Sequence, residues 1–145
     1  MSGTNSVSGA SANRMNAIVA TNAHLMVLCF GMNDNASAML YTNMLSIINR
    51  ARTAGMEVIV MPVPRTPTTE DGRYSLKDWR YMNRMAYNAA RDGGAAYVPT
   101  NWLTEDNGRG GMGLALTSLC GSDLRNHPGG VEMGVYGKAL INLFI

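Results

Sequence analysis

The chain has 145 residues, of which 46% are hydrophobic and 15% are charged. This size and apolar content fit one globular domain and exclude an intrinsically disordered chain. The net charge of +2 arises from 12 basic and 10 acidic residues scattered along the sequence, so no basic run indicates a nucleic-acid partner. No apolar run reaches the roughly 18 residues of a membrane span, and the N-terminus lacks the pattern of a signal peptide, so we expect a soluble protein.

The predicted elements alternate between helices and strands. The apolar run HLMVLCF lacks polar alternation, which indicates a strand buried on both faces, as in a parallel sheet covered by helices. Alternation of this kind predicts an α/β sandwich in one domain spanning 1–145. In chain order we expect a helix over 11–21, a strand over 24–30, a helix over 35–52, a strand over 57–63, a helix over 75–91, a short strand over 95–98 and a closing helix over 130–144.

The stretch FGMNDN follows the first predicted strand directly. Ligands of open α/β sheets bind at the carboxyl ends of the strands, so polar groups here lie where a site is expected. Gly31 allows a tight backbone passage, and the Asn33 side-chain amide can donate a hydrogen bond to a developing oxyanion. The alternative is that Asn33, Asp34 and Asn35 only turn the chain and cap the next helix.

A second polar stretch, SDLRNHPGG, precedes the last predicted helix. It places Asp123 and His127 in one loop, and a histidine that acts as a general base needs an acceptor such as an aspartate to hold its tautomer. The alternative is that Pro128 merely begins the helix. His24, the other histidine, starts an apolar strand and is interpreted as structural.

Together these stretches resemble the SGNH (GDSL) hydrolase family. SVSGAS is similar to the family's second sequence block, FGMND to its GxND block and DLRNHPGG to its Asp and His-Pro block, and they occur in the family's order over nearly the whole chain. The closing GGVEMGVYGKAL is similar to the family's final segment. The resemblance implies a three-layer α/β/α sandwich with a parallel, flavodoxin-like sheet.

The resemblance also implies roles for individual residues. Gly9 would contribute a backbone N–H and Asn33 a side-chain donor to the oxyanion hole, while His127 would be the base and Asp123 its orienting acid. The family places its aspartate three residues before the histidine, where this chain has Leu124. Either the loop carries one extra residue, or His127 works without a carboxylate from this place. No cofactor or metal site is expected.

The family's first block, the GDS stretch with the nucleophilic serine, is missing from this sequence. Ser6 is an alternative, degenerate nucleophile, although no apolar strand leads into it. The family's sheet has strand order 2-1-3-4-5, so without its first two strands the strand at 24–30 would lie at the sheet edge. An unpaired apolar edge promotes aggregation. We therefore expect a protein partner that supplies the first strands and the GDS serine.

The function implied by the resemblance is ester hydrolysis by a serine esterase. The expected substrate is a small ester, such as an O-acetyl group on a carbohydrate, as in many SGNH esterases including those of bacteriophage tail proteins. The alternative is an inactive SGNH-like module that binds glycans or serves as a structural part of a larger, virion-associated assembly. Tyr74, Trp79 and Trp102 either stack on sugar or close the core. An incomplete sequence is a third explanation. No nucleic-acid or membrane partner is expected.

Overall fold

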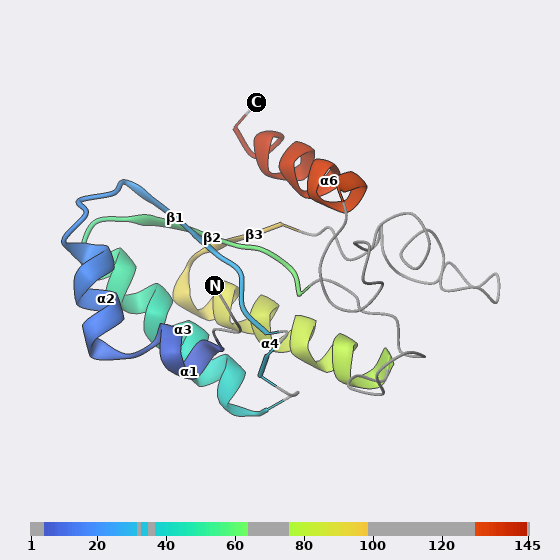
Figure 1. Cartoon of the computed structure of the whole chain (residues 1–145), viewed down its shortest axis with the longest axis horizontal. Helices are drawn as coiled ribbons and strands as arrows, with labels where there is room; N and C mark the ends of the chain where they lie inside the picture. Colours follow the sequence, from blue (N-terminus) through green and yellow to red (C-terminus); the bar gives the residue numbers. More distant parts are fainter. Residues whose placement is uncertain (1–4, 32, 35–36, 64–75, 99–129, 145) are drawn as a thin grey trace.

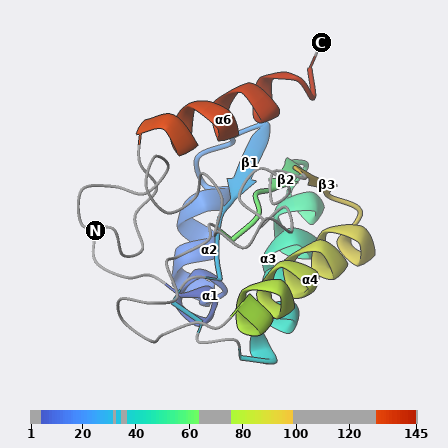
Figure 2. The same ribbon diagram turned by 90° about the vertical axis from the view of Figure 1, so that its right-hand side faces the viewer.

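The computed structural model describes residues 5–31, 33–34, 37–63, 76–98 and 130–144. In this part of the chain a parallel sheet lies between two layers of helices (Figures 1 and 2). This arrangement confirms the predicted α/β class. The helices are α1 (Ser6–Gly9), α2 (Ala12–Val19), α3 (Met39–Thr53), α4 (Leu76–Gly93) and α6 (Gly130–Ile141), and the strands are β1 (Leu25–Leu28), β2 (Glu57–Val60) and β3 (Ala96–Tyr97).

The described strands form a sheet of order β1-β2-β3, and both neighbouring pairs are parallel. Leu25 pairs with Glu57, and Val60 pairs with Tyr97. Both crossovers step in the same direction, and right-handed crossovers then place α3 and α4 on the same face of the sheet, as Figure 1 shows. Within the described residues β1 is an edge strand, as predicted from the missing first two strands.

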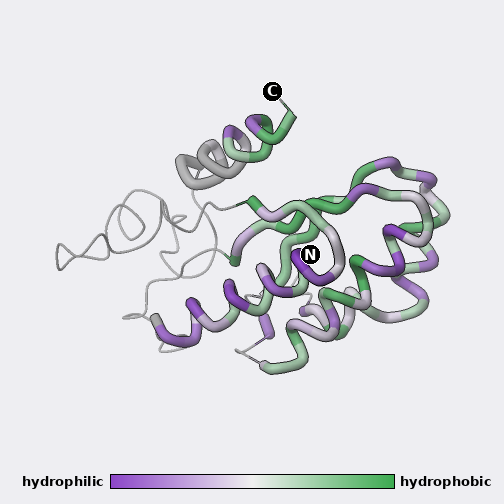
Figure 3. The backbone as a smooth tube through the Cα atoms, turned by 180° about the vertical axis from the view of Figure 1, so that it is seen from behind, coloured by the Kyte–Doolittle hydropathy of each residue, from purple (hydrophilic) through white to green (hydrophobic). Residues whose placement is uncertain are grey.

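The main core lies between the sheet and the layer formed by α1 to α4. The buried stripe of α3 recurs at helical spacing, and each of its larger apolar side chains contributes about 1.5–3 kcal/mol by leaving water. In Figure 3 the strands are mostly hydrophobic in colour, whereas α4 alternates between hydrophilic and apolar turns. The buried residues of α3 are Leu40, Met44, Ile47, Ile48 and Ala51.

The opposite face of the sheet is covered unevenly. The α6 residues Ala139 and Leu140 pack against a small cluster that includes Ile59. Leu25 and Val27 of β1 alternate with Met26 and Leu28, which pack into the main core, so their side chains point to the α6 face. They remain 40% and 45% exposed. The expectation that this strand is buried on both faces is therefore wrong for the described part of the chain, because no described element covers β1 on that side.

The segment after β2 is held by α4. Asn83 accepts a hydrogen bond from the Val63 N–H at 3.0 Å and donates to the Val63 carbonyl at 3.3 Å, so its amide satisfies both backbone polar groups of this residue. The Trp79 indole N–H donates to the same carbonyl at 2.9 Å. From β3, the Tyr97 hydroxyl donates to Asn83 Oδ1 at 3.2 Å, and burial raises the pKa of Tyr97 to about 12.

The observed elements agree with those predicted, with shorter strands and one addition. The short helix α1 was not predicted, because the Gly/Ser/Asn-rich start carries no apolar period. The side chain of Asn5 caps it by accepting from the Ser8 N–H at 3.0 Å. The helix predicted over 35–52 begins later, at Met39. Gly55 stands just beyond the end of α3 with φ of +85°, the position in which a helix commonly ends on glycine.

Replacing Gly31 by alanine is expected to destabilise the fold by about 1–3 kcal/mol. Gly31 has φ of +128°, and an added Cβ would overlap a methyl group of Val63. Urea denaturation of Gly31→Ala measures the loss. Gly134→Ala is the control, because a Cβ there meets nothing within 4 Å. Equal stability of Gly31→Ala and the native chain would contradict the close approach of the two strand ends.

The raised pKa of Tyr97 predicts a loss of stability at high pH. The folded state favours the neutral phenol, so this contribution is complete below the ordinary pKa of 10.0 and is lost as pH rises towards about 12. Full ionisation would lower the free energy of unfolding by about 3 kcal/mol. The free energy of unfolding, measured by urea denaturation between about pH 9 and 11.5, should fall more steeply with pH for the native chain than for Tyr97→Phe. Tyr81→Phe, at an exposed position, should keep the native slope.

Candidate active site

The candidate site lies at the carboxyl end of β1, where the chain passes through FGMND into α3. The Met61 N–H donates to the Leu28 carbonyl at 2.9 Å, so the segments after β1 and β2 still run side by side. Gly31 then approaches Val63 so closely that no side chain fits between them. The turn that follows is closed by the Asp34 N–H, which donates to the Gly31 carbonyl at 3.0 Å. Asn33 and Asp34 lie in this turn, just beyond the end of β1.

Asp34 connects this turn to the N-terminal segment. Its carboxylate accepts from the Ser6 N–H at 3.0 and 3.2 Å, and the Ser6 hydroxyl donates to Oδ1. The Asn43 amide of α3 donates to the Ser6 Oγ at 3.1 Å. Asp34 is only 7% exposed, and Ser6 has no exposed surface. Charge-assisted bonds of this kind are stronger than neutral ones, so they hold α1 against the end of β1.

The contacts of Ser6 do not support its role as a degenerate nucleophile. Its hydroxyl donates to Asp34 and accepts from Asn43, and the side chain is fully buried. A serine nucleophile must reach a substrate carbonyl and must be activated by a base. Its neighbours here are a carboxylate and an amide that bind it from two elements, so its observed role is structural.

The two predicted oxyanion donors differ in their surroundings. Asn33 immediately precedes Asp34, and its side chain is exposed at the sheet edge. Gly9 is buried against the ring of Phe30, and its N–H donates to the Asn5 carbonyl at 3.1 Å within α1. The structure thus brings the SVSG and GMND segments together, with Asn33 open to a ligand and the Gly9 N–H already engaged.

The predicted base and its orienting acid, His127 and Asp123, lie outside the described residues. Tyr74 and Trp102 also lie outside them. Trp79 is 3% exposed and donates to a backbone carbonyl, so it closes the core and does not line a sugar site. Asn83 was missed by sequence reasoning, because one asparagine on an amphipathic helix carries no signal until the end of β2 lies beside it.

An apolar groove of about 280 Å³ runs along β1 beside α2. Its lining includes Met26 and Val27 from the strand, Phe30 beyond it, and Ile18 from α2, with Arg14 at one side. The groove therefore follows the free edge of the described sheet. Unpaired strand edges with apolar flanks are the places where a further strand adds.

Among the described residues there is no group of three or more histidine, cysteine or acidic side chains that could hold a metal ion. The described helices also include none that is both long and apolar enough to cross a bilayer. His24, predicted to be structural, is exposed just before β1, and its carbonyl accepts from the Glu57 N–H at 2.8 Å.

These elements define an α/β protein in which helices lie on both faces of a parallel sheet and polar residues gather at a strand end. Among solved structures, the chain is similar to one titled "Crystal Structure of TesA", with a TM-score of 0.68 and 22% sequence identity. The match covers 99% of this chain and 72% of the TesA chain. It confirms the predicted α/β fold with a parallel sheet between helices. No family model matches the sequence, and no curated protein matches it.

The Ser6–Asp34 contact predicts unequal effects of two substitutions. Asp34→Asn should lower the free energy of unfolding by about 1–3 kcal/mol, because an amide cannot accept from both Ser6 donors in the same way. Ser6→Ala should cost about 1 kcal/mol, because the backbone N–H bond to Asp34 remains. Urea denaturation measures both losses. Ser8→Ala, at an exposed position of the same helix, is the control; a larger loss for it than for Asp34→Asn would contradict this role.

Proposed function

We propose that this chain is part of an SGNH-type serine esterase whose nucleophilic serine comes from polypeptide outside these 145 residues. The observation that carries the proposal is the contact between Ser6 and Asp34, which are 28 residues apart. This contact holds the SVSG and GMND segments together at the carboxyl end of β1. The resemblance to the SGNH family requires this proximity, and the fold shared with TesA supports it.

In the proposed reaction, the external serine attacks an ester carbonyl. His127 takes the serine proton and passes it to the leaving alcohol, and Asp123 orients the imidazole. The Asn33 amide donates to the oxyanion, since its exposed position at the strand end leaves it accessible to a ligand. Gly9 would become a second donor only if its N–H left the Asn5 carbonyl. Water then releases the acyl group by the same steps.

The free edge of β1 supports an external source for the serine. Leu25 and Val27 are exposed on one face of this strand, and the apolar groove lies along its edge. A partner strand paired with β1 would fill the groove along this edge and would end near Asn33, where strand carboxyl ends meet, and a further element of the partner would cover Leu25 and Val27. We propose an O-acetyl group on a carbohydrate as the substrate, a choice that depends on family analogy.

A catalytically inactive glycan-binding or structural module is the second candidate. The hydrogen bond from the Gly9 N–H to the Asn5 carbonyl favours it, because one of the two expected oxyanion donors is engaged within α1. The buried Ser6 hydroxyl agrees with it as well, since this serine has only structural contacts. In this alternative the SVSG and GMND segments keep the fold without a reaction.

The experiment is fluorophosphonate labelling of the protein isolated from its native source with any bound partner, followed by peptide mapping and an acetyl-ester assay. We expect the label on a serine outside these 145 residues. Asn33→Ala should lower kcat by roughly 10²- to 10³-fold, as for other side-chain oxyanion donors. Asn49→Ala, at an exposed position of α3, should leave the activity unchanged.

Each other outcome selects a different conclusion. Labelling of Ser6 would place the nucleophile in this chain and overturn the external source. No label and no hydrolysis from a folded, intact assembly would overturn the esterase and leave the inactive module. Equal activity of Asn33→Ala and Asn49→Ala would remove Asn33 from the oxyanion hole.

A further inference from the structure

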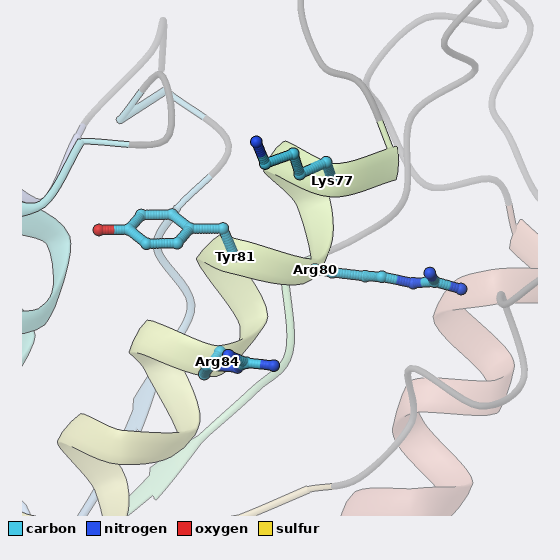
Figure 4. A pocket seen from close by; sticks show the side chains of 4 residues that line it. All are labelled: Lys77, Arg80, Tyr81 and Arg84. Carbon is cyan, nitrogen blue, oxygen red and sulfur yellow. The ribbon is translucent and has the colours of Figure 1, made fainter.

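The first half of α4 carries a row of basic residues whose Cα atoms lie along one side of the helix, while their side chains diverge from there (Figure 4). Lys77, Arg80 and Arg84, together with Tyr81, are spaced at i, i+3, i+4 and i+7, which places them along one side of a helix. They line a cavity of about 500 Å³ (Figure 4). The three cations lie within residues 77–84, and the helical spacing aligns them.

These three cations have no ion-pair partner among the described residues. An ion pair of α4 joins Arg91 and Asp92, with 2.8 Å between Nε and Oδ1, near the other end of the helix. Lys77, Arg80 and Arg84 are all exposed. Unneutralised charges of one sign around a hollow raise the local concentration of an oppositely charged ligand.

The directions of the side chains indicate an extended ligand. In Figure 4, Lys77 and Tyr81 extend to one side of α4, whereas Arg80 reaches the other way, towards α6. Because the two side chains point apart (Figure 4), a single compact anion could not contact both Lys77 and Arg80. Lys77 and Arg84 are seven residues apart, a rise of about 10 Å along the helix, so negative charges spaced along a chain would match them.

The charge distribution favours an acidic polysaccharide over nucleic acid. The sequence pI is about 8.7, below the range typical of nucleic-acid-binding domains. Tyr81, 36% exposed, presents a ring on which a sugar face can pack.

We propose that this face of α4, formed by Lys77, Arg80, Tyr81 and Arg84, binds a carboxylate-bearing polysaccharide. The site is formed by side chains of α4, whereas Asn33 follows β1. It is independent of the esterase proposal, because it needs no nucleophile.

The test is titration of the full chain with polygalacturonate at several salt concentrations. The double variant Arg80→Gln/Arg84→Gln should bind about fivefold more weakly and with a shallower salt dependence. Arg14→Gln/Lys138→Gln is the matched control, because it removes the same charge from exposed positions of α2 and α6. It should change the affinity by less than about twofold. Circular dichroism confirms that both variants are folded.

Four results would overturn the proposal. The first is that the native chain does not bind the polymer. The second is that both double variants lose the same affinity, which would indicate attraction by net charge alone. Equal binding of the fully methyl-esterified polymer would exclude recognition of the carboxylates. Single-stranded DNA that displaced the polysaccharide, at a lower concentration of negative charge than the polysaccharide carries, would identify a nucleic-acid surface. None of these results bears on fluorophosphonate labelling, so the two proposals can fail separately.

Discussion

The rest of the structure depends on the buried carboxylate of Asp34. It receives the backbone N–H and the hydroxyl of Ser6, and Asn43 completes the network from α3. A buried carboxylate is costly without such donors, so its presence beneath an exposed strand end requires them. The network fixes where α1 lies, and through α1 it fixes the position of Gly9 against Phe30.

The same sheet is stabilised unequally on its two sides. Among the described residues, one face carries a continuous core against α1 to α4, whereas the other has the α6 contact with the cluster around Ile59, and β1 lies at the edge of the sheet. The polar strand end and the uncovered edge belong to the same strand, which places the proposed partner surface beside the proposed oxyanion donor. The basic face of α4 is a different surface, created by helical spacing alone.

The candidate site was predictable in part. The position of Asn33 and Asp34 after an apolar strand could be read from the residues, because a strand end is marked by the change from apolar to polar. The binding partner of Asp34 could not, because a serine 28 residues away carries no signal in a local pattern. The clamp that Asn83 forms on Val63 was hidden for the same reason.

The sequence by itself determined the order of helices and strands, the parallel α/β class and the strand end that carries FGMND, because each depends on local periodicity and turn residues. Tertiary structure alone decided that Ser6 is buried and hydrogen-bonded to Asp34, that the Gly9 N–H is engaged within α1, and that Leu25 and Val27 of β1 are exposed. Such features depend on which distant segments meet, and that depends on packing and on the satisfaction of buried polar groups across the whole fold.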